Sequence, residues 1–153
     1  MASPIHARIL RRIALVAILV ICVPSCGSNQ QPCYSVHGEV FAVQGNERVP
    51  AAGAIVVFHP ASSSSGDAVK PTAHVGDDGK FSLTTYADGD GAPVGDYSVT
   101  IEWFAPRPPP PYKPTQAGDK LKGRYASPAT TSIRYSVEKD KDNNMAPIEL
   151  KLP

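Results

Sequence analysis

Tyr97-Ser98-Val99-Thr100-Ile101-Glu102-Trp103 is the stretch that decides the fold class. Large apolar side chains occupy every second position in it, which is the spacing of one face of a β-strand. These positions are Tyr97, Val99, Ile101 and Trp103. We expect the polar residues between them to face water. They are Ser98, Thr100 and Glu102.

Similar short runs recur on both sides of this stretch. Residues 36–43 and 133–137 alternate like half-buried strands, and residues 53–59 form a nearly continuous apolar run that ends at Pro60, as expected for a central strand. Further strands are expected at residues 72–75, 81–85 and 148–152. No helical periodicity follows residue 26. We therefore predict an all-β fold, an antiparallel β-sandwich of about seven strands.

Two segments rich in aspartate and glycine predict tight turns. Asp77-Asp78-Gly79 lies between two expected strands and predicts a hairpin, because Asp-Gly tolerates the backbone angles of such turns. Asp88-Gly89-Asp90-Gly91-Ala92-Pro93 predicts the turn before Tyr97. Calcium binding by these aspartates is an alternative, but the full calcium loop with its closing glutamate is absent.

A proline-rich loop is expected at residues 105–114, which contain Pro106, the run Pro108 to Pro111, and Pro114. Proline cannot donate a ladder hydrogen bond, so this segment should leave the sheet as a stiff excursion. A ligand for an aromatic groove is the alternative to a spacer.

The first 25 residues have the composition of a signal peptide. Arg8, Arg11 and Arg12 form a basic segment, and the apolar run Ile13 to Val23 follows it. A membrane-spanning helix needs roughly 20 apolar residues, and Pro24 interrupts this run at about half that length. We therefore predict that residues 1–25 are cleaved.

Val23-Pro24-Ser25-Cys26 resembles the lipobox at which bacteria cut and acylate lipoproteins. A small residue, Ser25, precedes the cysteine and gives the peptidase access to the backbone. Two or more acyl chains on Cys26 would hold the protein on a membrane. Ordinary secretory cleavage near Ser25 or Gly27 is the alternative, and Cys22 is a poorer candidate because it lies inside the apolar run.

Cleavage before Cys26 would leave residues 26–35 as a lipidated tether and residues 36–153 as one domain. The chain has 15 basic and 14 acidic residues, and three arginines lie in the leader, so the remainder is weakly acidic. This balance argues against nucleic acid as a partner. We expect Cys33 to be a free thiol in the tether; an intermolecular disulfide is the alternative.

Four segments resemble carboxypeptidase regulatory-like domains: residues 36–40, 49–60, 78–83 and 95–100. This resemblance implies a transthyretin-like sandwich. Over residues 36–152 the chain is more specifically similar to small lipoproteins of the planctomycete type. The matching features are Asp88 to Pro93, Trp103 and Leu121 to Tyr125. The resemblance says little about activity, since a shared fold does not carry function.

Aromatic residues near the proline-rich loop are the candidate ligand-binding residues, because exposed rings can stack on sugars. They are Trp103, Tyr112 and Tyr125. We expect no metal site and no cofactor, because the three histidines after the leader lie on separate strands without a local ligand pair. They are His37, His59 and His74.

No motif for a nucleophile with its base, for paired carboxylates or for a phosphate-binding loop is present. We therefore expect a non-catalytic, lipid-anchored protein of the cell envelope that faces the periplasm or the cell exterior. Its expected partners are the membrane, through Cys26, and an envelope protein or a glycan. A carbohydrate-binding module is the alternative function, and a transthyretin-like hydrolase is a remote one.

Overall fold

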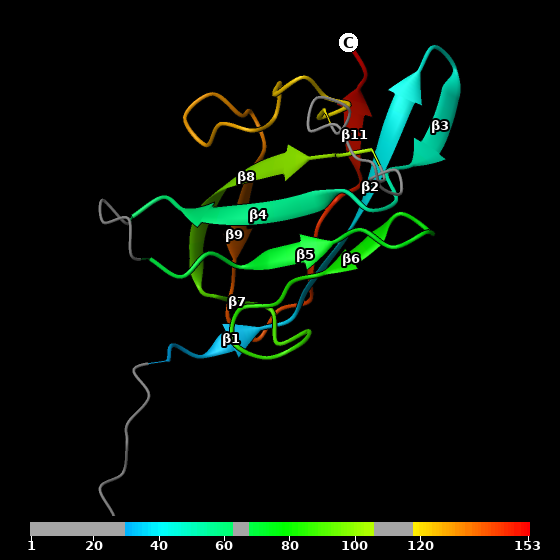
Figure 1. Ribbon diagram of the computed structural model, residues 1–153. Helices are drawn as coiled ribbons and strands as arrows, with labels where there is room; N and C mark the ends of the chain where they lie inside the picture. The colour runs from blue at the N-terminus through cyan, green and yellow to red at the C-terminus, as the bar shows by residue number, and fades with distance from the viewer. Residues whose placement is uncertain (1–29, 63–67, 106–117) are drawn as a thin grey trace, which may run out of the picture.

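The computed structural model describes residues 30–62, 68–105 and 118–153, and these residues form an all-β structure without a helix (Figure 1). Cys26 and Tyr112 therefore lie outside the described residues. The strands are β1 (Cys33–Tyr34), β2 (Val36–Gln44), β3 (Glu47–Pro50), β4 (Ile55–Pro60), β5 (Thr72–His74), β6 (Lys80–Ser82), β7 (Ala92–Pro93), β8 (Gly95–Glu102), β9 (Arg134–Val137), β10 (Asn143–Asn144) and β11 (Ile148–Lys151).

Strand β8 lies inside an antiparallel sheet with the order β5-β4-β8-β9. The predicted inward positions of β8 are all buried, and Trp103 directly after it is only 8% exposed. Strand β4 has a partner on each side, since Val57 pairs with both Thr72 and Thr100. The predictions of an alternating strand and of a central strand that ends at Pro60 are confirmed.

One outward position of β8 departs from the prediction. Ser98 and Glu102 are partly exposed, whereas Thr100 is 4% exposed. The Thr100 hydroxyl is hydrogen-bonded to Nε2 of His59 on the neighbouring strand, at 2.8 Å. The hydroxyl is therefore satisfied by a cross-strand side chain instead of by water.

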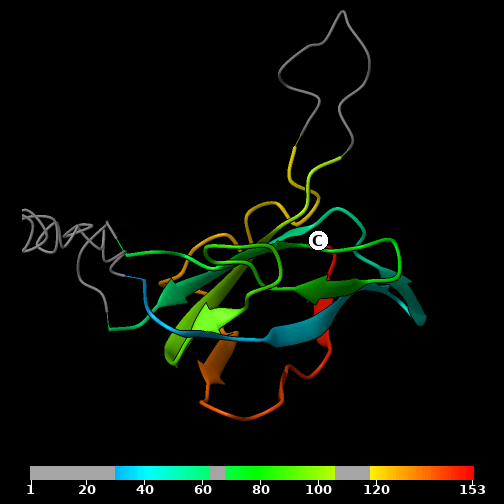
Figure 2. The same ribbon diagram turned by 90° about the horizontal axis from the view of Figure 1, so that it is seen from below.

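The second sheet is built around β2, and its strands are not all antiparallel. β3 and β6 pair with β2 antiparallel, whereas β10 and β11 pair with it parallel. Figure 2 shows the chain after β9 looping along the lower edge of the view before β11 joins β2. The expectation of a wholly antiparallel arrangement is wrong here, because alternation along a strand is the same for both directions.

Both sheets contribute to one hydrophobic cluster. Val40 from β2, Phe58 from β4 and Ile101 from β8 are fully buried in it. Gly38 of β2 makes room for this packing, since a Cβ at Gly38 would lie 2.6 Å from the ring of Phe81. In Figure 1, β4 and β5 run across the view while β2 and β11 run steeply, so the strands of the two sheets cross.

The segment Asp77 to Gly79 forms the predicted turn but not a simple hairpin. The Gly76 N–H donates to the Lys80 carbonyl at 2.8 Å, and Gly79 has a φ of 86°. The flanking strands then separate: β5 pairs with β4, whereas β6 pairs with β2. One bridge, Thr72 with Thr84, still joins them. The turn therefore connects the two sheets.

The turn at Asp88 to Pro93 is stabilised by the carboxylate of Asp90. One oxygen of the Asp90 carboxylate accepts the Thr85 N–H at 2.7 Å, and the other accepts those of Tyr86 and Ala87 at 2.9 and 3.0 Å. Burial alone would raise the pKa of Asp90, but these backbone donors outweigh it and the pKa is lowered. The carboxylate thus serves as a turn cap.

Candidate functional site

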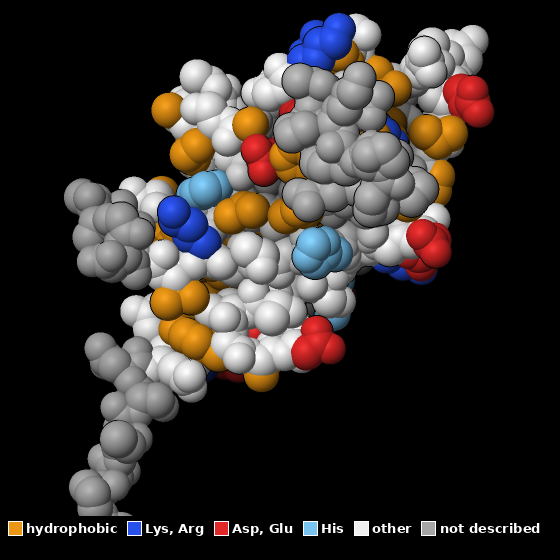
Figure 3. Space-filling view, viewed as in Figure 1, with side chains coloured by type: hydrophobic (Ala, Val, Ile, Leu, Met, Phe, Trp, Pro, Cys, Tyr) orange, Lys and Arg blue, Asp and Glu red, His pale blue; other side chains and the backbone are white. Residues whose placement is uncertain are grey.

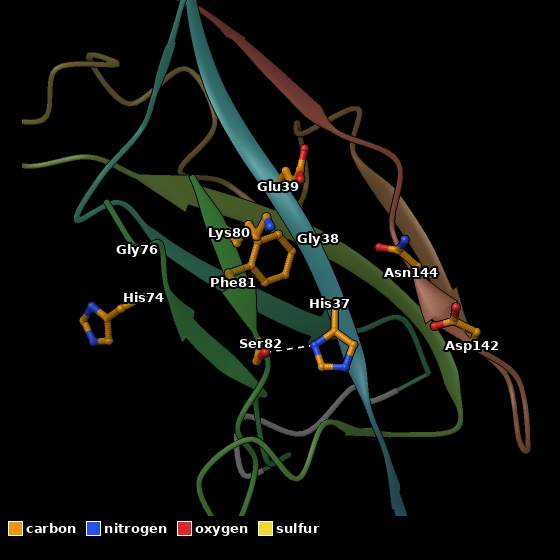
Figure 4. Close-up of a pocket in the computed structure, with 10 residues that line it drawn as sticks. All are labelled: His37, Gly38, Glu39, His74, Gly76, Lys80, Phe81, Ser82, Asp142 and Asn144. Atoms are coloured by element: carbon orange, nitrogen blue, oxygen red, sulfur yellow. Dashed lines mark hydrogen bonds between the residues drawn. The ribbon is translucent and has the colours of Figure 1, made fainter. Parts of the chain in front are cut away.

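An open groove of about 530 Å³ lies on the outer face of the β2 sheet. We call it the His37 groove. Its residues come from four strands and two adjoining turns. Figure 4 shows His37 pointing toward Ser82, while Asn144 and Asp142 lie across β2. The groove is lined by His37, Gly38, Glu39, His74, Gly76, Lys80, Phe81, Ser82, Asp142 and Asn144.

Strand register brings the polar side chains of the His37 groove together. His37 and Glu39 occupy the outward positions of β2, between the inward-facing Val36, Gly38 and Val40. His37 lies opposite Ser82 on one side and Asn144 on the other. The groove is thus a row of polar groups across three strands.

The closest contact in the groove joins His37 and Ser82. Nδ1 of His37 and Oγ of Ser82 are 2.9 Å apart, a separation that also suits a nucleophile and its base. Such a pair normally needs a third group that orients the imidazole. Among the described residues, no carboxylate is hydrogen-bonded to the His37 ring. The geometry therefore suits hydrogen bonding to a ligand.

The groove carries charges of both signs. Glu39 pairs in register with Lys80, and Asp142 lies at the far side of β2. Charges of both signs in one groove favour a polar ligand of low net charge over a polyanion. The alternation at residues 36–43 predicts a half-buried strand but does not predict the groove. Only the register of β2 with β6 and β10 assembles it.

Two of the three candidate aromatic residues, Trp103 and Tyr125, lie in the described part of the chain, and both are engaged by the domain itself. Trp103 is 8% exposed, its Nε1–H donates to the Ala52 carbonyl at 2.9 Å, and the Lys120 ammonium lies 3.9 Å from the ring centroid. Its ring therefore offers no open face for stacking on a sugar. Tyr125 is partly buried against the core, and its hydroxyl accepts the Lys151 N–H at 3.1 Å.

The remaining histidines do not converge on one point. His59 is bonded to Thr100, and burial, followed by the charge of Lys70, lowers its pKa. His74 lines the His37 groove, but Figure 4 shows its ring pointing away from His37. No group of three histidine, cysteine or acidic side chains in the described part of the chain could hold a metal ion.

Cys33 lies in β1, paired with Pro93 of β7, and not in a free tether. The folded part therefore begins earlier than the expected boundary at residue 36. Burial raises the pKa of the Cys33 thiol, and the Asp90 carboxylate adds to the effect while a bond to Thr85 opposes it. A thiol with a raised pKa is a weak nucleophile at neutral pH.

No protein-family model, no curated protein and no solved structure matches the chain. Within residues 30–62, 68–105 and 118–153, no helix is long and apolar enough to cross a bilayer.

Proposed function

We propose that this chain is a lipid-anchored protein of the bacterial cell envelope, attached through Cys26 and facing the periplasm or the cell exterior. The observation that carries the proposal is Val23-Pro24-Ser25-Cys26, which directly follows the apolar run from Ile13. The basic segment before this run and the small residue before the cysteine suit export and cleavage. The domain is a non-catalytic binding or structural module.

We also propose that the two sheets form a β-sandwich of the transthyretin-like type. The shared hydrophobic cluster supports this proposal, because one core between two sheets is the basis of a sandwich. The matching segments at residues 36–40 and 95–100 coincide with β2 and β8, which both supply that core.

Binding at the His37 groove is the role that the geometry supports best for the module. The groove offers hydrogen-bonding side chains and charges of both signs on an open face. The partner is an envelope protein or a polar glycan, held by hydrogen bonds. Sugar stacking on Trp103 is not favoured, because that ring is buried.

The anchor is tested by the intact mass of the mature protein and by its distribution between membrane and soluble fractions. Wild type should lack residues 1–25 and carry added acyl mass. Cys26→Ala should lose that mass and leave the membrane fraction. Cys22→Ala is the matched control and should behave like wild type. A Cys26→Ala protein that is processed and retained like wild type contradicts the proposal.

A further inference from the structure

Exposed apolar side chains surround the point where the described chain begins. We call Pro32, Val69, Tyr86 and Val94 the tether-end patch. Val94 is 54% exposed, Val69 47% and Tyr86 36%, which makes them three of the five exposed large hydrophobic residues of the described chain. Figure 3 shows hydrophobic side chains gathered at the lower left of the domain, where its first described residues lie.

The patch is one continuous surface around Gln31. The Gln31 N–H donates to the Tyr86 hydroxyl at 3.4 Å. A shallow hollow of about 250 Å³ is lined by Gln31 together with Val69, Tyr86 and Val94. A second hollow of about 260 Å³ is lined by Gln31, Pro32 and Val94. Side chains from distant parts of the sequence thus meet at the first folded residues.

The length of chain before the domain limits where this surface can lie. Only four residues lie between Cys26 and Gln31, so their Cα atoms, five residue steps apart, can be separated by at most about 18 Å. Because β1 pairs with β7, the patch and the first folded residues belong to the same rigid part of the domain. With acyl chains on Cys26 in a bilayer, the patch cannot move far from the headgroup layer, which extends roughly 5–7 Å beyond the hydrocarbon core.

We propose that the tether-end patch rests in the headgroup layer of the same membrane that holds the lipid anchor. This inference rests on the proposed anchor at Cys26. The patch contacts the lipid surface. The β2–β3 hairpin lies at the opposite end of the domain in Figure 1 and Figure 2 and therefore points away from the membrane.

The chemistry of the patch suits a membrane interface. Tyrosine is favoured there because its ring is apolar and its hydroxyl remains hydrated. Valine and proline bring apolar area without charge. Asp96 also lines the hollow that contains Val69 and Tyr86, but its carboxylate accepts a hydrogen bond from the Ser136 hydroxyl, which satisfies one of its oxygens. Docking would therefore cover apolar area while the nearby carboxylate keeps a protein partner.

The test places a nitroxide label at Val94→Cys, in the full-length lipoprotein with Cys33→Ser, after reconstitution into vesicles of phosphatidylethanolamine and phosphatidylglycerol. Val49→Cys is the matched control, because Val49 is also an exposed valine, at 36%, and lies on β3 at the far end. Val69→Cys provides an independent second site. The experiment measures how often each nitroxide label collides with two quenchers: oxygen, which enters lipid, and a nickel chelate, which stays in water.

We expect labels at positions 94 and 69 to meet the nickel chelate several-fold less often than the label at 49, and to meet oxygen more often. If the intact mass shows the lipid but the labels at positions 94 and 49 collide equally often with each quencher, the proposed orientation is wrong and the anchor is not affected. Protection from both quenchers would indicate a protein partner and would also overturn it. A chain without lipid mass would overturn the anchor, and the orientation with it.

Discussion

The backbone of Tyr34 occupies the space that a side chain at Gly91 would need. A Cβ on Gly91 would overlap with the Tyr34 carbonyl group and lie 2.8 Å from Cα of Ser35. Gly91 also has a φ of 89°, which side-chain-bearing residues rarely adopt. The Asp88 to Pro93 turn therefore accommodates β1 through one glycine, and β1 is the strand that connects the domain to the proposed anchor.

Gly91→Ala should displace β1 and lower the free energy of unfolding by about 3 kcal/mol, because backbone strain and backbone overlap add. Gly89→Ala is the control, since Gly89 also has a positive φ, 68°, but open space around it. It should cost about 1 kcal/mol. Urea unfolding measures both values, and equal losses would show that Tyr34 does not approach Gly91 in solution.

Asp90→Asn should lower the free energy of unfolding by about 1–2 kcal/mol, because three N–H groups lose a charged acceptor. The pKa of Asp90 is lowered in the folded state, so its contribution is present above the unfolded pKa of about 3.9. It is lost as the pH falls through the folded pKa.

Urea unfolding from neutral to acidic pH tests this dependence. The difference in free energy of unfolding between wild type and Asp90→Asn should become smaller toward acidic pH. Asp88→Asn should have little effect, since Asp88 caps no backbone group among the described residues. A gap that stays constant down to acidic pH contradicts the capping role.

Gly38→Ala should destabilise the protein by about 1–3 kcal/mol, because the added methyl group would press on the buried Phe81 ring. Phe81→Leu removes that ring and should make the same alanine substitution cost less. A double-mutant cycle from urea unfolding measures the coupling between the two positions. Additive effects would show that the ring does not fill the space above Gly38.

Tyr97→Phe should cost about 1 kcal/mol below pH 10, because the buried phenol donates to the Pro93 carbonyl at 2.8 Å. Burial, with smaller effects from Cys33 and Tyr86, raises the pKa of Tyr97 to about 12. An unfolded tyrosine ionises near pH 10, so the stability of wild type falls between about pH 10 and 12.

The loss of stability at alkaline pH should be smaller in Tyr97→Phe than in wild type. Part of the loss should remain, because burial also raises the pKa of Tyr135. Unfolding measured at a series of alkaline pH values, together with tyrosinate absorbance, gives both quantities. An identical alkaline fall in the two proteins would show that the Tyr97 phenol is accessible to water.

Local pattern was enough to predict the all-β class. The patterns that predict this class each span only a few residues. They are the alternation in β8 and β2, the apolar run of β4 and the glycine turns at Gly79 and Gly91. The leader and Cys26 were likewise predicted from local composition, and they lie outside the described residues.

Tertiary structure decided what depends on partners distant in sequence. Alternation does not encode strand direction, so the parallel pairing of β11 with β2 was not predictable from Ile148 or Leu150. Alternation placed Trp103 on the same face as Ile101, but only residues distant in sequence supply the partners of its indole ring, the Ala52 carbonyl and the Lys120 ammonium. The His37 groove likewise exists because register sets Ser82, His37 and Asn144 side by side, and no local signal fixes that register.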